Sequence, residues 1–297
     1  SAFVTVQRGC DYRCTFCIVP MTRGRERSRN LEDVVGEVTN IAQQGTTEVT
    51  LLGQTVNSYN DGRHEFGALL RAVGAVDGIK RVRFTSPYPN DFTPTVVEAM
   101  AAVPEVCEHV HLPVQSGSTR LLKPMGRRYT RDQYLECVDR LRTAIPDLAI
   151  TTDIIVGFPG ETDDDFSQTV SLVREVAFDD AFTFRYSPRE GTAAVRLPHA
   201  VPDDVSGSRL RELIAVVRDV ARRKNVALVG STHEVLVEKP ARRGNLLQTR
   251  TRTNKVALVD GPTEWIGSYR EVRLTGTSGA TFTAVPTTSH VELAIIG

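Results

Sequence analysis

Short β-branched segments alternate with amphipathic helical segments over roughly the first 185 residues of this 297-residue chain. Six such strand–helix alternations favour a parallel sheet whose strands are joined by crossover helices. A closed barrel of eight such units usually needs about 250 residues, so the pattern predicts an open, partial (β/α)6 barrel. Strands are expected at 3–7, 48–53, 81–85, 109–113, 148–156 and 181–186, and helices at 31–44, 65–76, 94–102, 131–144 and 163–176.

The composition changes after a long, arginine-rich amphipathic helix that is expected at 203–228. From residue 231 onward the chain is rich in Val, Thr and Gly, and about five short strands alternate with turn residues. This pattern predicts a small antiparallel β-barrel. We therefore expect two domains, an α/β domain over residues 1–229 and the barrel over residues 230–297.

The charges of the chain balance, with 36 basic and 36 acidic residues, so net charge alone does not indicate a nucleic-acid-binding protein. Residues 1–29 nevertheless contain six arginines and only two acidic residues, a local excess that would attract a polyanion. No apolar stretch approaches the roughly 20 residues of a membrane span, and no signal peptide is recognisable. Clustered thiols favour a reducing compartment, so we expect a cytoplasmic protein without a membrane partner.

Three cysteines, Cys10, Cys14 and Cys17, lie on one short segment with the spacing CxxxCxxC. Structural zinc takes four protein ligands, and this segment supplies three. A 4Fe-4S cluster held by three thiolates keeps one iron open for a small-molecule ligand, so the spacing favours a reactive cluster over a structural metal site. Cys107 and Cys137 lie far from the other three in apolar contexts, where a cysteine usually acts as a small buried hydrophobe.

Polar, glycine-containing loops follow three of the expected strands, at 53–59, 115–118 and 157–161. Glycine permits close backbone approach, and Gln or Asn side chains can hydrogen-bond the amino and carboxylate groups of an amino acid. The Asp153 carboxylate precedes the third loop and could bind a ribose. Any one of these loops also fits an ordinary strand–helix turn, but together they indicate a cofactor cleft at one end of the sheet.

The cysteine segment, with an aromatic residue before its last cysteine, resembles the cluster loop of the radical S-adenosylmethionine (radical SAM) enzymes. Segments 23–29, 52–58, 111–118, 125–127, 155–161 and 186–192 further resemble the methylthiotransferase branch of that superfamily, and most of all its tRNA-modifying, MiaB-type members. Segment 248–255 resembles part of the small TRAM barrel that binds RNA in the same branch. The resemblance covers nearly the whole chain in order and spacing.

This resemblance implies one 4Fe-4S cluster whose open iron binds S-adenosylmethionine and cleaves it reductively to a 5′-deoxyadenosyl radical. The implied reaction is methylthiolation of C2 of N6-isopentenyladenosine next to the anticodon of tRNA. The implied partners are a tRNA anticodon stem-loop and a reducing electron donor of the flavodoxin or ferredoxin kind, and we expect a monomer.

The resemblance also implies roles for individual residues. For the arginines named at the end of this paragraph, the alternative to a contact with RNA is a solvated surface position or an ion pair within the protein. The cluster ligands are Cys10, Cys14 and Cys17; the residues near S-adenosylmethionine are Phe16, Gly53, Gln54, Asn57, Gln115, Ser116, Asp153 and Gly157; and the residues facing RNA or substrate are Arg23, Arg25, Arg189, Arg250, Arg252 and Lys255.

Full-length members of the branch have an N-terminal domain whose three further cysteines hold a second, sulfur-donating 4Fe-4S cluster. This sequence has no counterpart of that domain, and it begins with Ser1 rather than Met. We therefore expect a fragment that cleaves S-adenosylmethionine but does not insert sulfur by itself.

Other functions remain open at this point. A related, RimO-like branch methylthiolates an aspartate of a ribosomal protein, and another acts on threonylcarbamoyl-adenosine in tRNA. The barrel could be a structural appendage or a protein-docking module. A non-enzymatic RNA-binding protein with a structural or redox-sensing cluster is the alternative from a different class.

Overall fold

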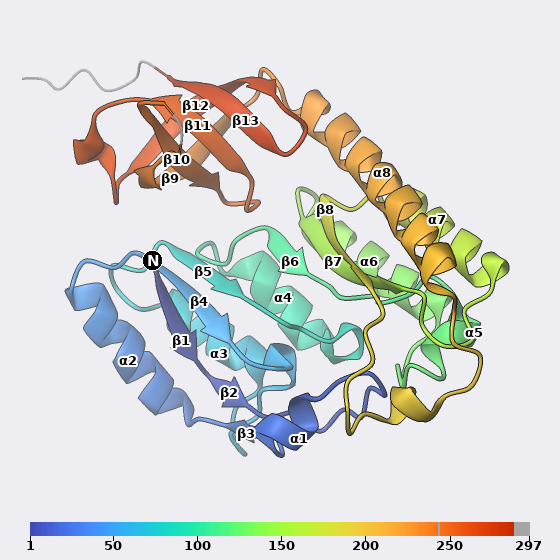
Figure 1. The fold of residues 1–297 in the computed structure, drawn as a ribbon. Helices are drawn as coiled ribbons and strands as arrows, with labels where there is room; N and C mark the ends of the chain where they lie inside the picture. The colour runs from blue at the N-terminus through green and yellow to red at the C-terminus, as the bar shows by residue number, and fades with distance from the viewer. Residues whose placement is uncertain (243, 288–297) are drawn as a thin grey trace, which may run out of the picture. The chain divides into compact units, whose positions relative to one another are not determined.

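The computed structural model describes residues 1–242 and 244–287 and divides the chain into two compact units, Ser1–Val220 and Ala221–Gly297 (Figure 1). The division lies within the long helix α8 (Asp203–Ala227). The domain boundary expected from composition, between residues 229 and 230, lies just beyond the end of that helix.

The larger unit contains six parallel strands that follow one another across the sheet in sequence order. An isolated bridge between Val82 and Val106 connects the first three strands to the last three. No pairing in the described residues closes the first strand on the last, so the predicted open (β/α)6 barrel is confirmed. The strands are β1 (Ala2–Thr5), β4 (Glu48–Leu52), β5 (Arg81–Phe84), β6 (His109–His111), β7 (Ala149–Val156) and β8 (Asp180–Arg185).

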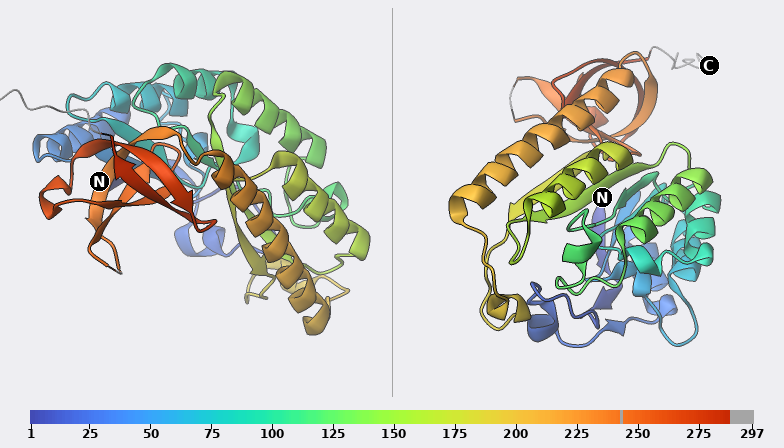
Figure 2. Two further views of the ribbon diagram at one scale, coloured as in Figure 1. Left: turned by 90° about the horizontal axis from the view of Figure 1, so that it is seen from above. Right: turned by 90° about the vertical axis from the view of Figure 1, so that its right-hand side faces the viewer.

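The crossover helices lie on the outer face of this sheet (Figure 2). Four of them, α2, α4, α6 and α7, begin at the residue that the sequence predicts. In the last three, a threonine side chain accepts a backbone N–H of the first turn and so marks the start. Within the described residues, every helix is too short or too polar to cross a lipid bilayer. The five crossover helices are α2 (Leu31–Gln43), α3 (Phe66–Gly74), α4 (Pro94–Ala102), α6 (Arg131–Ala144) and α7 (Asp163–Val176).

Several short elements were not predicted, because two to five residues are too few to show a periodic pattern. Two of them, β2 and β3, pair antiparallel on either side of residues 9–26, which include the cysteine segment. These short elements are β2 (Gln7–Arg8), α1 (Val19–Arg23), β3 (Arg27–Ser28), η1 (Val56–Ser58), η2 (Pro89–Asp91), α5 (Thr119–Leu122) and η3 (Ala193–Arg196).

The smaller unit is a closed five-stranded barrel with the strand order β10-β11-β13-β12-β9. Its core contains Val235, Val259 and Phe282, each nearly fully buried. Neighbouring strands are antiparallel, as predicted, except that β11 and β13 run parallel. The barrel elements are β9 (Thr232–Pro240), β10 (Leu246–Thr251), β11 (Val256–Asp260), η4 (Thr263–Trp265), β12 (Tyr269–Thr277) and β13 (Thr281–Pro286).

Candidate functional site

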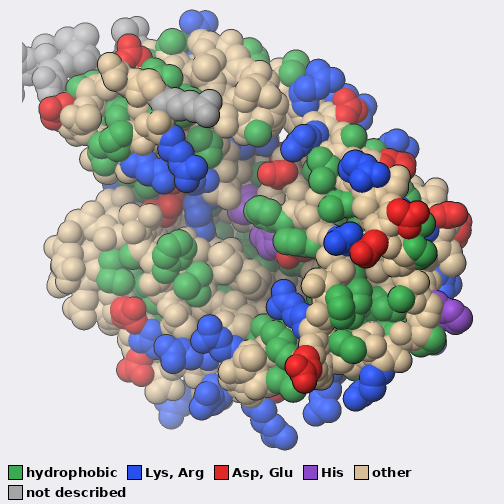
Figure 3. All heavy atoms as spheres, viewed as in Figure 1, with side chains coloured by type: hydrophobic (Ala, Val, Ile, Leu, Met, Phe, Trp, Pro, Cys, Tyr) green, Lys and Arg blue, Asp and Glu red, His purple; other side chains and the backbone are tan. Residues whose placement is uncertain are grey.

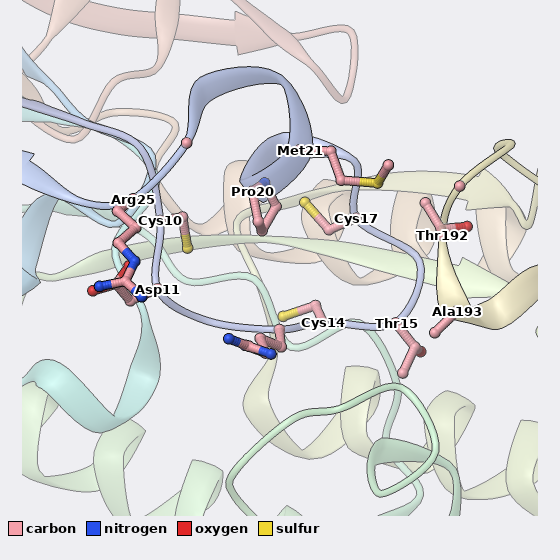
Figure 4. A pocket seen from close by; sticks show the side chains of 13 residues that line it. Cys10, Asp11, Cys14, Thr15, Cys17, Pro20, Met21, Arg25, Thr192 and Ala193 are labelled. Carbon is pink, nitrogen blue, oxygen red and sulfur yellow. The ribbon is translucent and has the colours of Figure 1, made fainter.

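The three clustered cysteines line one cavity of about 600 Å³ beyond the carboxyl end of β1. Figure 4 shows the sulfur atoms of Cys10, Cys14 and Cys17 turned toward a common space. All three thiols are free and partly exposed. Within the described residues they do not form a tight ligand set for a single metal ion. A cluster of four irons holds its cysteines at separate corners, so wider spacing is what such a cluster needs.

Two glycines hold the cysteine segment in place. Gly9 has a φ of 80°, its N–H donates to Gln54 Oε1 at 2.6 Å, and a Cβ atom there would overlap the Arg25 carbonyl. Gly126 has a φ of 75°, and a Cβ atom there would lie 2.8 Å from the carbonyl oxygen of Arg13. The segment is therefore enclosed from both sides by backbone that only glycine allows.

The thiols lie in different surroundings. Burial raises the pKa of Cys10 and of Cys17 above the ordinary value of a thiol. Cys10 Sγ lies 3.1 Å from Thr55 Oγ1, and Cys14 Sγ accepts a hydrogen bond from Arg127 Nη1 at 3.4 Å. A metal that binds these sulfurs would deprotonate them and offset the cost of burying a thiolate.

A second cavity, of about 350 Å³, shares Cys17 with the first. Phe16, Gln115 and Asp153 all line it, as the predicted cofactor cleft requires. Asp153 Oδ2 lies 3.3 Å from His111 Nε2, a contact that orients the carboxylate. Gln115 has a φ of 70°, a conformation that is rare for a residue with a side chain and that clusters at functional sites.

Tyr186 also lines the second cavity, and the sequence analysis assigned it no role. Its ring packs edge-on against Phe158 at 5.2 Å between ring centroids. Its hydroxyl is buried and has no hydrogen-bond partner in the described part of the chain, and burial raises its pKa. Buried hydroxyls are normally hydrogen-bonded, so this unsatisfied group marks a place where a bound molecule can supply the partner. The signal in the sequence was the motif 186–192.

Three predicted cofactor residues after β4 contact the protein itself. Asn57 is buried, and its amide donates to the carbonyl of Tyr88 at 2.9 Å and accepts from the N–H of Tyr88 at 2.7 Å. The Gln54 side chain holds the N–H of Gly9, as described above. Gly53 packs so closely that a Cβ atom would lie 2.6 Å from Gln7 Oε1. None of the three lines either cavity, so their contact with the methionine end of a cofactor stays a prediction.

Two further predicted residues support neighbouring helices. Ser116 is fully buried, and its Oγ lies 3.4 Å from Thr169 Oγ1 on α7. Gly157 has a φ of 73° and packs against Ser206 of α8, while its N–H donates to Glu161 Oε2 at 2.7 Å. Neither residue lines the two cavities, and their roles toward a cofactor stay predictions as well.

Two of the arginines predicted to face RNA lie at the cavities. Arg25 lines the first cavity and Arg189 the second, whereas Arg23 is exposed at the end of α1. Figure 3 shows Lys and Arg side chains along the lower edge of the view, in the region where Figure 1 places α1 and β3. Arg8, Arg13 and Arg27 of the same N-terminal stretch are exposed as well.

The basic residues predicted in the barrel contact other groups. Arg250 pairs with Glu238, with 2.5 Å between Nε and Oε1, and these hydrogen bonds outweigh burial and lower the pKa of Glu238. Lys255 Nζ donates to Asn225 Oδ1 at 2.8 Å, and Arg252 is partly buried. The positive charge of Arg250 is therefore largely offset within the barrel.

A family model described as the radical SAM superfamily matches residues 4–173, which is more than half of the chain. The chain belongs to the radical SAM superfamily. The match covers the cysteine segment and strands β4, β5, β6 and β7.

Among curated proteins, similar relatives have the name tRNA-2-methylthio-N(6)-dimethylallyladenosine synthase. The relative from Moorella thermoacetica is 50% identical over 279 residues, which are 92% of this chain and 63% of the relative. The relative from Caldicellulosiruptor saccharolyticus is 48% identical over 277 residues, 92% of this chain and 59% of the relative. The predicted kinship with the tRNA methylthiotransferases is confirmed, and the chain spans about three fifths of the length of these relatives.

Solved structures share the fold at lower identity. One is the radical S-adenosylmethionine methyltransferase TsrM from Kitasatospora setae, solved with cobalamin and a [4Fe-4S] cluster bound. It aligns with a TM-score of 0.52 and 20% identity, and the alignment covers 62% of this chain and 36% of that chain. Streptococcus suis SuiB bound to S-adenosylmethionine aligns with a TM-score of 0.51 at 18% identity, over 75% of this chain and 48% of that chain. These likenesses establish the fold and nothing more specific.

Proposed function

We propose that this chain is the radical SAM core of a tRNA methylthiotransferase that modifies C2 of N6-isopentenyladenosine (N6-dimethylallyladenosine) next to the anticodon. The observation behind the proposal is the arrangement of two adjoining cavities. Three free cysteines of one segment line the first cavity. Phe16, Gln115 and Asp153 line the second, and Cys17 lines both. The relatives that are 46–50% identical support this substrate. They do not support the ribosomal-protein or threonylcarbamoyl-adenosine alternatives.

The residues present fit a 4Fe-4S cluster with S-adenosylmethionine. Thiolates are the ligands that such a cluster prefers, and three of them leave one iron open. The unsatisfied hydroxyl of Tyr186 and the Asp153 carboxylate provide polar partners for a bound nucleoside in the adjoining cavity. When bound, this pair of cofactors supplies one-electron cleavage of a sulfonium and a radical that takes a hydrogen atom from carbon.

The chain itself would position and shield these groups. Cys10, Cys14 and Cys17 would hold the cluster, and the apolar ring of Phe16 would border the adenine. Asp153, oriented by His111, would accept hydrogen bonds from ribose hydroxyls. Close packing of backbone against Gly9 and Gly126 would hold the cysteine segment in place, so the three thiolates would be positioned for the cluster with little reorganisation.

The exposed arginines at and near the two cavities support an RNA substrate. Phosphate contacts by Arg23, Arg25 and Arg189 would be independent of base identity and would place an anticodon loop over the cavities. Bases of such a loop are single-stranded and can be splayed out, which an enzyme acting on a base edge requires.

The remaining roles belong to the same proposal. Residues 1–229 form the catalytic domain, and residues 230–297 form a TRAM-like RNA-binding domain in which Arg250, Arg252 and Lys255 contribute to RNA affinity. The protein acts in the cytoplasm as a monomer with a flavodoxin-like or ferredoxin-like electron donor. A second 4Fe-4S cluster, which donates sulfur, requires three cysteines beyond the five in this sequence.

Anaerobic reconstitution with iron and sulfide, followed by dithionite and S-adenosylmethionine, tests the proposal. We expect 5′-deoxyadenosine from the reconstituted chain and none from Cys14→Ala, because that variant lacks one of the three thiolates. Nucleoside analysis of N6-isopentenyladenosine-containing tRNA treated with this chain should show no methylthio product.

Cys137→Ala is the matched control. It also removes one thiol, but Cys137 is buried on α6, where burial raises its pKa to about 11, and it lines neither cavity. This variant should retain the cluster and the cleavage activity. An intact wild-type cluster that yields no 5′-deoxyadenosine would contradict the proposed catalytic role and would point to a structural or sensing cluster.

A further inference from the structure

The side chain of Arg127 donates a hydrogen bond to one of the three sulfurs proposed to hold the cluster. Its Nη1 lies 3.4 Å from Cys14 Sγ, a sulfur 113 residues earlier in the sequence. Its other nitrogens are fixed as well, since Nη2 donates to the Pro113 carbonyl at 2.9 Å and Nε to the Tyr129 hydroxyl at 2.8 Å. Three separate acceptors therefore determine the position of one planar guanidinium group.

Aromatic rings enclose the same guanidinium. Its central carbon lies 4.5 Å from the ring centroid of Tyr88 and 5.1 Å from that of Tyr129. Tyr88 in turn stacks on Tyr12 of the cysteine segment at 3.8 Å between centroids. The rings shield the cation from water and strengthen its electrostatic interactions.

The surroundings of Arg127 differ from those of an ordinary buried ion pair. No carboxylate within the described residues pairs with it, and its hydrogen-bond acceptors are a carbonyl, a phenol and the Cys14 sulfur. A guanidinium is not deprotonated in proteins, so the group is a cation. Burying a cation away from water raises the free energy of the folded state unless an anion lies beside it. The Cys14 thiolate and the cluster bound to it would be that anion.

We propose that Arg127 is a positioning residue that orients the Cys14 ligand and raises the reduction potential of the cluster. The inference rests on the proposed function, because it requires that Cys14 binds a 4Fe-4S cluster. A cluster with three thiolates gains one negative charge on reduction, and a nearby cation with an N–H···S bond stabilises the more negative state. Without Arg127 the cluster should be harder to reduce.

An EPR-monitored redox titration of the reconstituted chain tests this without RNA or S-adenosylmethionine. Arg127→Met keeps the length of the side chain and removes both the charge and the N–H donors. We expect its equilibrium constant for reduction to fall by about tenfold or more, which for one electron is about 59 mV or more toward negative potential. Arg127→Lys keeps the charge but loses the fixed fork of donors, so it should give a smaller shift in the same direction.

Arg128→Met is the matched control. It removes the same charge one residue away, from an exposed side chain that lies 5.3 Å from the Tyr12 ring centroid. It should leave the potential close to the wild-type value. Loss of the cluster in Arg127→Met, with retention in Arg127→Lys and Arg128→Met, is also the result expected of a positioning residue.

Three results would overturn the inference. An Arg127→Met cluster with the wild-type potential refutes it while leaving the proposed function intact. Equal shifts, or equal cluster loss, in Arg127→Met and Arg128→Met would show an effect of net charge alone. A wild-type chain that assembles no cluster overturns this inference and the proposed function together.

Discussion

Gly126→Ala should disturb the cysteine segment through a single added methyl group. The backbone of Gly126 has a φ of 75°, and a Cβ atom there would lie 2.8 Å from the Arg13 carbonyl oxygen and 3.2 Å from the Cα of Cys14. Both neighbours are backbone atoms, so no side chain can rotate away to make room. The cysteine segment itself has to move.

The magnitude has two parts. A residue with a Cβ atom in the left-handed region costs about 1–2 kcal/mol, and forcing extra volume into a packed site costs about 1–3 kcal/mol more. Gly45→Ala separates the two, because Gly45 has a φ of 89° and, among the residues that the structure describes, no neighbouring atom lies within 4 Å of its Cβ position. We therefore expect a loss of about 1–2 kcal/mol in the free energy of unfolding for Gly45→Ala and about 2–5 kcal/mol for Gly126→Ala.

Urea unfolding of the metal-free chain measures these free energies, and iron and sulfide analysis after anaerobic reconstitution measures cluster content. Gly126→Ala should lose a large part of the iron, because the displaced segment contains Cys14, whereas Gly45→Ala should bind as much iron as the wild type. Equal destabilisation of the two variants together with full iron in Gly126→Ala would refute the close-approach argument.

Two further predictions concern stability. Burial alone would raise the pKa of Asp165, but hydrogen bonds from Arg120 and Ser118 outweigh it and hold that pKa below its usual range. The stabilisation, about 1–3 kcal/mol at pH 7, is therefore lost only as the pH falls below about 4. The difference between wild type and Asp165→Asn in urea unfolding should be largest at pH 7 and should shrink steadily as the pH falls below 4, and a pH-independent difference would contradict the assignment. Asn57→Ala leaves the buried N–H and carbonyl of Tyr88 unpaired, so the free energy of unfolding should fall by about 2–4 kcal/mol. A loss below about 0.5 kcal/mol would show that water replaces the amide.

Local sequence patterns predicted most of the fold. Helices α4, α6 and α7 begin and end at the predicted residues, and in each case a threonine cap marks the start. The six parallel strands of the larger unit were also predicted to within two residues at either end. Caps and periodic apolar residues act over three or four neighbouring positions, so they can be recognised without knowledge of the fold.

The candidate site was predicted less completely. Cysteine spacing located the three thiols, and the strand-end rule brought Phe16, Gln115 and Asp153 to the same cavity. The same rule did not show that Asn57 uses both polar atoms of its amide on the Tyr88 backbone. A polar residue at a strand end can face a ligand or hold a neighbouring loop, and the residue type is the same in both cases.

By itself the sequence determined that the chain forms an open α/β barrel followed by a small β-barrel, and that three thiols lie on one segment after the first strand. Only the tertiary structure decided which distant groups complete that segment. Gly126 and Arg127 reach it from more than 100 residues away, and in the described part of the chain the buried Tyr186 hydroxyl has no hydrogen-bond partner. Such contacts depend on how the ends of several strands converge in space, and no pattern within a few neighbouring residues encodes that convergence.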